Sequence, residues 1–295
     1  MKALVITENE AAARELCGGA RALVDEVVYL TFGEPVAGIA DKCIKVTVPE
    51  DQVKEAALDT MHAVAKREDP QIVLFEPTRR LKSMVGRIAA REDSSVITDV
   101  MEFCDSAAKS MYFGGVGLRT AKALTAISFC SVSQGAFGDV EPCGTNEVEE
   151  VDFVASDTTV ECVSREALPP AEVDLTAAKR IVAAGRGFAK EEELDLARTF
   201  CKEIGAELGC TRPLTESEAW FPREAYIGVS GLMLSPDVYV GIGVSGQMQH
   251  MVGVDRARVS FAINKDSNAP IFQKVDFGLV GEIADVLPKI NAKLA

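Results

Sequence analysis

The stretch GIGVSGQMQH, at residues 241–250, combines small residues, a hydroxyl and an imidazole within ten positions. Glycines that follow a strand let the backbone approach a ligand, and free N–H groups there can hold a phosphate. Two similar junctions come earlier, AAGRGF at 183–188 and YIGVSGLMLSP at 226–236. Together the three predict a ligand site with phosphate contacts, although glycines in any one of them could simply form a tight turn. GIGVSG also fits the GxGxxG spacing of dinucleotide-binding loops, which is a weak signal when it stands alone.

Charged and polar side chains accompany these junctions. Arg186 lies between two glycines, and Arg212 follows a cysteine and a threonine. An arginine among glycines has few local side chains to pair with, so a bound anion is a reasonable partner; the alternative is a solvated arginine. Ser230 and Ser245 each precede a glycine, and His250 ends the third junction. A lone histidine in an apolar segment is more often a satisfied core residue than a functional one, so both interpretations of His250 stay open.

The overall composition excludes several classes of protein. The 295 residues include 31 Lys and Arg against 45 Asp and Glu, a net charge of −14 that repels nucleic acid and anionic lipid. No window approaches the roughly 18 apolar residues of a membrane helix, so we expect no membrane insertion. MKALVITENE reads as a first buried strand and not as a signal peptide. Eight cysteines without a CxxC pair, and only two histidines, predict reduced thiols in a cytoplasmic protein without a metal site.

Strand-like and helix-like segments alternate through the first half of the chain. Helices of about 10–15 residues between strands predict a parallel α/β sheet. Residues 110–170 differ, because they are rich in β-branched and aromatic residues without a helical period, and they predict extended strands that could run antiparallel. The other predicted elements of this half are strands at 2–7, 26–30, 71–77 and 94–100 and helices at 10–24, 53–67 and 80–91.

A Pro-Pro pair in LPPAEVDLTAAK, at 168–179, marks a linker between two domains, which we place at 1–170 and 171–295. The fold class is therefore α/β, with two domains that each hold a largely parallel sheet flanked by helices. An acidic-start amphipathic helix is expected over 191–208, with Gly209 just past its end. The other elements expected after the linker are strands at 179–185, 238–244, 258–264 and 277–282 and a closing helix at 283–294 despite Pro288.

Five strings then occur in a fixed order: GRGF, GCTR, YIGVSG, GIGVSGQMQH and AINKDSNAPIFQKVDFGLVGEI. They resemble the C-terminal, FAD-binding domain of the electron transfer flavoprotein alpha subunit, over roughly residues 179–295. The first domain resembles this family more weakly, through residues 2–7, ITDV and QGAFG. The resemblance implies a Rossmann-like C-terminal domain that binds FAD. It also implies an electron carrier and not a substrate-converting enzyme, and the chain shows no nucleophile–base pair.

The same resemblance implies a set of partners. The chain would form a heterodimer with an electron transfer flavoprotein beta subunit, which in this family binds AMP or a second FAD. Together they would shuttle electrons from a dehydrogenase, often of the acyl-CoA type, to a quinone oxidoreductase or a ferredoxin-type acceptor.

The resemblance further assigns residues to parts of FAD. Arg186 would approach the phosphate or adenosine side, and Arg212 would lie against the isoalloxazine ring and favour its anionic reduced forms. The Ser230 hydroxyl would lie near N5, and His250 would face the C2 carbonyl, where an anionic flavin would raise the pKa of the imidazole. Residues 245–250 would surround the pyrophosphate and ring, and Asn264, Glu282 and Ile283 the adenosine side. The implied cofactor-binding residues are Arg186, Thr211, Arg212, Ile227, Gly228, Val229, Ser230, Ser245, Gly246, Gln247, Met248, Gln249, His250, Asn264, Asp266, Glu282 and Ile283.

The chain departs from the family pattern at one of these loops. Where the family has Gln-Thr-Gly-Lys, residues 229–232 read Val-Ser-Gly-Leu, which keeps a hydroxyl but loses an amide and a lysine charge. FAD binding stays the expectation, while the flavin potential and the redox partners stay open. One alternative is an NAD-dependent oxidoreductase that uses the same loops. Another is a structural subunit that has lost its flavin, against which the retained Arg212, Ser230 and His250 argue.

Overall fold

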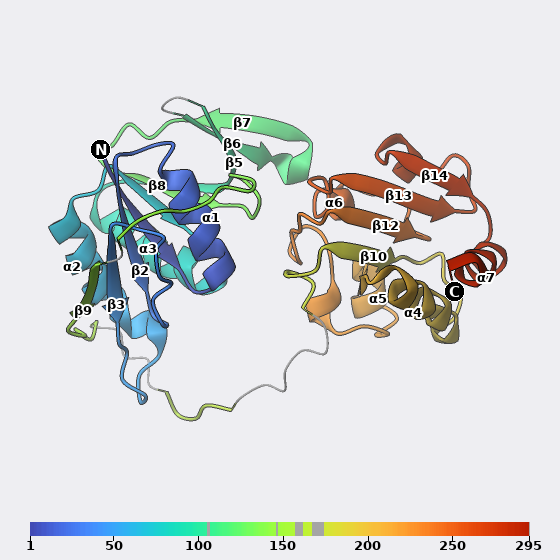
Figure 1. Cartoon of the computed structure of the whole chain (residues 1–295), viewed down its shortest axis with the longest axis horizontal. Coiled ribbons are helices and arrows are strands. Elements are labelled where there is room, and N and C mark those ends of the chain that lie inside the picture. The colour runs from blue at the N-terminus through green and yellow to red at the C-terminus, as the bar shows by residue number, and fades with distance from the viewer. Residues whose placement is uncertain (105–106, 146, 157–161, 167–173, 295) are drawn as a thin grey trace. The chain divides into compact units, whose positions relative to one another are not determined.

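The computed structural model describes residues 1–104, 107–145, 147–156, 162–166 and 174–294. Two compact units divide the chain near residue 168. The domain boundary expected between 170 and 171, and the Pro-Pro pair of the expected linker, lie outside the described residues. Each unit is built on a sheet of its own (Figure 1).

The sheet of the first unit has nine strands in the described part of the chain. They are β1 (Lys2–Thr7), β2 (Glu26–Thr31), β3 (Lys42–Val46), β4 (Ile72–Phe75), β5 (Val96–Cys104), β6 (Ala107–Tyr112), β7 (Gly117–Ala121), β8 (Ser128–Val132) and β9 (Glu147–Val151). Their spatial order is β7-β6-β5-β8-β4-β1-β2-β3-β9. All pairs from β5 to β9 along this order are parallel, and β5, β6 and β7 pair antiparallel.

Within the part of the first unit that the structure describes, three α-helices cover the two faces of the sheet: α1 (Glu10–Ala20), α2 (Leu58–Glu68) and α3 (Arg79–Arg91). The side chain of Asn9 accepts the N–H of Ala12, and that of Thr78 accepts the N–H of Leu81, so α1 and α3 each begin at a side-chain cap. The apolar stripe of α1 packs on one face of the sheet, and those of α2 and α3 pack on the other. The predicted helix at 53–67 is instead a 3-10 turn, Lys54–Ala57, followed by α2.

Residues 110–170 only partly follow the prediction of antiparallel strands. β6 and β7 pair antiparallel, which the composition of this stretch allowed. The antiparallel pairing of β5 with β6 was not predicted, because residues 94–100 were assigned to the parallel alternation. In contrast, β8 runs parallel to β4 and β5, and β9 runs parallel to β3. The direction of these two strands depends on which strand lies beside them, and no local pattern encodes that neighbour. The strand β3 was also missed, because its lysines interrupt the apolar run.

In its described residues, the second unit is built on five parallel strands: β10 (Arg180–Ala184), β11 (Glu207–Cys210), β12 (Val238–Ile242), β13 (Val259–Asn264) and β14 (Phe277–Val280). Their order is β11-β10-β12-β13-β14. The order reverses between β10 and β12, because β11 lies on one side of β10 and all later strands lie on the other. Such a reversal is the switch point at which open parallel sheets bind ligands.

The helix predicted over 191–208 is shorter than expected. After a 3-10 turn at Glu191–Glu193, α4 (Leu194–Ile204) ends at Gly205, which adopts a left-handed conformation with φ 59°. Gly205, and not Gly209, is therefore the helix terminator. Residues 207–210 form β11 instead, because they pair with β10.

Helices and loops cover opposite faces of the second sheet. The helices α4 and α7 (Ile283–Leu294) contact each other and pack on one face (Figure 1). The other face is covered by the connections around Ile227, Met251 and Ile271. Two short helices, α5 (Arg212–Glu216) and α6 (Met248–Met251), lie in the connections after β11 and β12.

No helix in the described part of the chain has the length and apolar character needed to span a membrane. The described residues also contain no cluster of histidine, cysteine and acidic side chains that could hold a metal ion.

Candidate functional site

Most of the residues singled out in the sequence lie at the carboxyl ends of the five strands of the second sheet. Arg186 follows β10, Arg212 follows β11, and Ser245 follows β12. Asn264 ends β13, and Glu282 follows β14. Because all five strands are parallel, these positions share one edge of the sheet.

The glycines of the first and third junctions let two loops touch backbone to backbone. A Cβ on Gly185 would lie 2.3 Å from the carbonyl oxygen of Gly243, and a Cβ on Gly187 would lie 2.5 Å from the Gly243 Cα. The N–H of Gly187 donates to Gly243 O over 3.0 Å. These glycines therefore do more than form turns, because they bring the loops after β10 and β12 together at the switch point.

The third junction turns back across the face of the sheet after Gly246. Gly243 and Gly246 have φ values of 65° and 85°, which only glycine adopts without strain. A Cβ on Gly246 would lie 2.3 Å from the backbone nitrogen of Ile271. The turn is held by two bonds, from Ile271 N to Ser245 O over 3.1 Å and from Asn264 Nδ2 to Val244 O over 2.9 Å. Asn264 thus positions the loop with its own amide.

The backbone N–H groups from Ser245 to Gln249 have no acceptor among the described residues. Runs of free N–H groups in a turn with left-handed residues form concavities that bind anions. Gly246 is buried, and buried backbone donors are normally paired. The loop therefore offers consecutive donors to a ligand at the switch point.

The second junction packs beside the third. The N–H of Val229 donates to Gln249 O over 2.8 Å, and a Cβ on Gly228 would lie 2.3 Å from the same oxygen. Ser230 is exposed and has φ 68°, an uncommon conformation for a residue with a side chain. Its hydroxyl donates to the neighbouring Val229 O over 2.5 Å. Residues 226–232 form only isolated bridges, so this junction does not follow a regular strand.

Arg212 and Arg186 both lie at this edge, and they differ in whether an acidic side chain pairs with them. Arg212 is exposed and its Nε donates to Glu216 Oε2 over 2.7 Å, a contact that raises the pKa of the guanidinium. Arg186 is exposed and has no ion-pair partner among the described residues. Thr211, just before Arg212, is buried, and its N–H donates to Ala184 O over 2.9 Å.

At the far end of the edge, the acidic residues serve local structure. Asp266 accepts the N–H of Asn268 over 2.9 Å. Glu282 lies 3.7 Å from the Nζ of Lys265, and both side chains are exposed. Ile283, the first residue of α7, is buried in the core.

His250 is a buried residue with both ring nitrogens engaged. Its Nδ1 lies 3.0 Å from Ile227 O, and its Nε2 lies 2.8 Å from the hydroxyl of Tyr239. A carbonyl only accepts, so Nδ1 carries the proton, and the neutral ring accepts the Tyr239 hydroxyl at Nε2. Burial lowers the pKa of His250 to about 4. Any rise of this pKa beside an anionic ligand would start from that value.

The sequence offered no sign of Tyr239 as the partner of His250. Tyr239 lies in β12, is fully buried, and was read only as part of an apolar strand. Its contact with His250 arises because the chain after Gly246 folds back over β12.

The first sheet also has a switch point, between β1 and β4. Its backbone donors are taken by a side chain of the protein, Glu76. Glu76, after β4, is 9% exposed. Its Oε2 accepts the N–H groups of Glu8 and Asn9, after β1, over 2.8 and 3.3 Å. Burial raises the pKa of this carboxyl group. Because a carboxylate already takes the donors that a phosphate would use, the second sheet holds the better anion site.

Comparison with known proteins agrees with this geometry. Residues 4–156 match the family model of the electron transfer flavoprotein domain, and residues 174–255 match that of the electron transfer flavoprotein FAD-binding domain. The chain belongs to the electron transfer flavoprotein alpha family. Protein FixB of Salmonella typhimurium (strain LT2) is 34% identical over 306 residues, which cover 99% of this chain and 97% of that protein. Protein FixB of Escherichia coli O127:H6 is 33% identical over 304 residues, with the same coverage.

A solved structure, UDP-GlcNAc 2-epimerase from Methanocaldococcus jannaschii, shares 8% identity with a TM-score of 0.35, over 99% of this chain and 92% of that one.

As a member of this family, the chain is an electron transfer flavoprotein subunit whose cofactor is FAD, and its family partner is a beta subunit. The match to an FAD-binding domain decides against the NAD alternative. The unpaired N–H groups and left-handed glycines of the β12 loop fit the diphosphate of FAD.

Proposed function

We propose that FAD lies along the carboxyl edge of the second sheet, with its ring near β11 and its adenosine near β14. The observation that carries this proposal is the run of unpaired N–H groups from Ser245 to Gln249 at the switch point. These donors would hold the pyrophosphate midway along the edge, with Arg186 beside them in the loop after β10.

The strand order supports this direction of the cofactor. From β11 to β14, the strand ends present Arg212, Arg186, Ser245, Asn264 and Glu282 in turn. The resemblance assigned the first of these residues to the ring and the last two to the adenosine. A cofactor laid along the edge would therefore meet them in the order of its own parts.

The residues at the ring end would tune the potential. FAD supplies the electron-transfer chemistry when bound, and the protein sets its electronics. A guanidinium at the ring stabilises negative charge there, so Arg212 would favour reduction of the flavin. Glu216 holds this side chain on the surface at present, and exposed ion pairs of this kind contribute little free energy. Arg212 is thus free to exchange Glu216 for the flavin.

In the cell, the chain would act with its beta subunit as a carrier between two larger proteins. The donor would be a dehydrogenase, of the acyl-CoA type, and the acceptor a quinone oxidoreductase or a ferredoxin-type protein. Membership of the family supports the carrier role, and the donor and acceptor rest on the resemblance alone.

The role of Arg212 is tested by a reductive titration of the flavin-loaded full chain. We expect Arg212→Ala to lower the midpoint potential by about 30 mV or more, since ~1.4 kcal/mol of lost charge stabilisation gives this shift in a two-electron couple. Arg258→Ala is the matched control, because Arg258 is also an exposed arginine paired with an acid, Asp237, but lies at the amino edge of the sheet. Equal potentials for Arg212→Ala and the wild type would remove Arg212 from the ring.

A further inference from the structure

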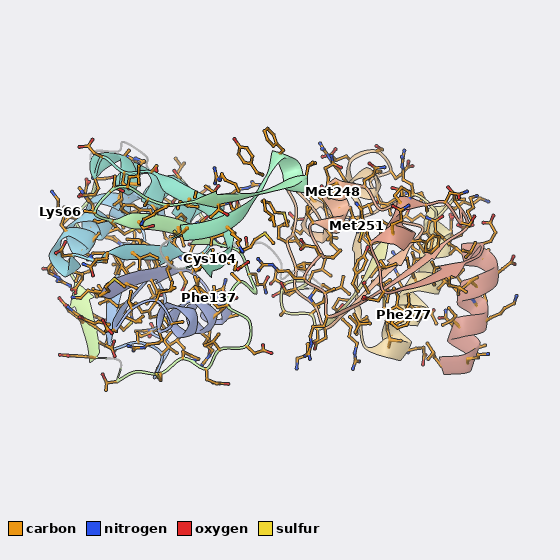
Figure 2. All side chains as sticks on the ribbon, turned by 90° about the horizontal axis from the view of Figure 1, so that it is seen from above. Lys66, Cys104, Phe137, Met248, Met251 and Phe277 are labelled. Atoms are coloured by element: carbon orange, nitrogen blue, oxygen red, sulfur yellow. The ribbon has the colours of Figure 1, made fainter. Side chains whose placement is uncertain are left out.

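A lysine to which the family resemblance assigns no role, Lys274, reaches the same loop from another strand connection. Lys274 follows the 3-10 turn Pro270–Gln273, between β13 and β14. Its Nζ donates to the carbonyl oxygen of Gly246 over 3.1 Å and lies 3.9 Å from the sulfur of Met248. Met248 is labelled in Figure 2.

The position of Lys274 relative to the loop is fixed by packing. Ile271, in the same 3-10 turn, donates its N–H to Ser245 O, and its backbone fills the space beside Gly246. The N–H of Lys274 in turn donates to Ile271 O over 2.9 Å. The ammonium group is therefore held at the loop by the backbone on which it sits.

Lys274 has no acidic partner within ion-pair distance among the described residues, although the chain carries a large acidic excess. Its neighbours at the same edge differ, since Lys265 lies 3.7 Å from Glu282 and Arg212 lies 2.7 Å from Glu216. An ammonium group has three donor hydrogens, and one carbonyl uses only one of them. Lys274 therefore keeps charge and donors available for an anion.

The contact between Lys274 and the Gly246 carbonyl also makes the electrostatic potential at the loop more favourable for an anion. A carbonyl oxygen carries partial negative charge and would repel a phosphate beside it. An ammonium on that oxygen offsets this charge, so that the unpaired N–H groups on either side of Gly246 dominate. The effect is strongest for a ligand with two phosphates at the loop.

We propose that Lys274 is a pyrophosphate-binding residue of the dinucleotide site, acting from the side of the loop opposite Arg186. This inference rests on the proposed FAD site and adds a cation to which the family resemblance assigns no role. It predicts that Lys274 acts on the diphosphate and not on the ring.

Binding to the flavin-free full chain tests the proposal, with FAD and riboflavin as probes followed by flavin fluorescence. We expect Lys274→Met to raise the FAD dissociation constant about tenfold, as for the loss of one charge-assisted hydrogen bond. Riboflavin has no phosphate, so its affinity should not change. Lys274→Arg should restore most of the FAD affinity. Lys202→Met is the control, because Lys202 is an exposed lysine in the last turn of α4, at the amino edge of the sheet.

Two results would overturn the assignment: equal FAD affinities for the wild type and Lys274→Met, or equal losses for FAD and riboflavin, which would indicate a purely structural role. Competition by inorganic pyrophosphate separates this proposal from the proposed FAD site. If the wild type binds no FAD but binds pyrophosphate or NAD in a manner that needs Lys274, the FAD site fails and the Lys274 assignment stands. If neither FAD nor pyrophosphate binding depends on Lys274, the assignment fails.

Discussion

At the scale of single residues, His250 shows what a sequence leaves undecided. The sequence allowed a core histidine or a ligand-facing one. In the structure the ring bonds to Ile227 O and to the Tyr239 hydroxyl, so the imidazole is satisfied by the protein itself. This outcome could not be predicted, because neither partner is near His250 in the sequence, and both contacts arise from the fold of the connection after β12.

The buried neutral His250 predicts a pH dependence of stability. Its pKa is lowered by burial to about 4, below the usual 6.5. The unfolded chain therefore binds a proton that the folded chain refuses, and stability is lost as the pH falls from about 6.5 towards 4. We expect the free energy of unfolding to fall by about 2 kcal/mol between pH 7 and 5 from this residue alone.

Urea unfolding followed by tryptophan fluorescence measures this effect, because the single tryptophan, Trp220, lies in the second unit. His250→Gln should flatten the pH dependence, and the matched control His62→Gln, in α2 of the first unit, should leave it unchanged. An unchanged slope in His250→Gln would contradict the lowered pKa.

At the scale of elements, the alternation of strands and helices was predictable and their ends were not. The apolar runs of β1, β4 and β12 identified these strands directly. The residues of β11 read as the end of a helix, because Glu207 and Leu208 continue the pattern of α4. They form a strand for two reasons. Gly205 ends the helix, which is a local effect, and β10 offers a free edge for pairing, which is a tertiary effect.

The close contact of glycine loops is the element-level feature that the site depends on. We expect Gly246→Ala to lower the free energy of unfolding of the second unit by more than about 2 kcal/mol. The added methyl group would meet the Ile271 backbone at 2.3 Å and force an alanine into φ 85°. Trp220 fluorescence in urea measures this change.

The control for this substitution is Gly86→Ala, inside α3, where an added Cβ has nothing within 4 Å. Alanine favours a helix interior over glycine by about 1 kcal/mol, so far-UV circular dichroism should show the first unit stabilised. Similar effects of the two substitutions would show that the loop contact is not as tight as described.

At the scale of the whole molecule, the sheets of the two units share a reversal of strand order but differ in what meets the backbone N–H groups at that reversal. Both reverse their strand order at a switch point, a feature that alternating strands and helices predict only in outline. In the first unit Glu76 fills the crevice, and in the second the loop N–H groups stay unpaired. The sequence pointed to the second unit through its glycine junctions, but it gave no sign of the role of Glu76.

Removing the Glu76 carboxylate should cost stability without affecting the cofactor. We expect Glu76→Ala to lower the free energy of unfolding by about 1–3 kcal/mol, since the N–H groups of Glu8 and Asn9 lose their acceptor. Glu76→Gln keeps an acceptor oxygen and should lose less. Flavin content should be the same in the wild type, Glu76→Ala and Glu76→Gln. A loss of flavin in Glu76→Ala would indicate that the first unit binds the cofactor, which contradicts the proposed site in the second unit.

The most direct test of the account is the absorbance spectrum of the full chain between about 300 and 600 nm, after purification with its beta subunit and separation from it. We expect flavin bands with about one FAD per chain. We expect no flavin in Ser245→Asp, because a carboxylate on this exposed residue would repel the pyrophosphate from the unpaired N–H groups. A wild-type chain that stays colourless after addition of FAD, or a Ser245→Asp chain that keeps its flavin, would contradict the proposed site.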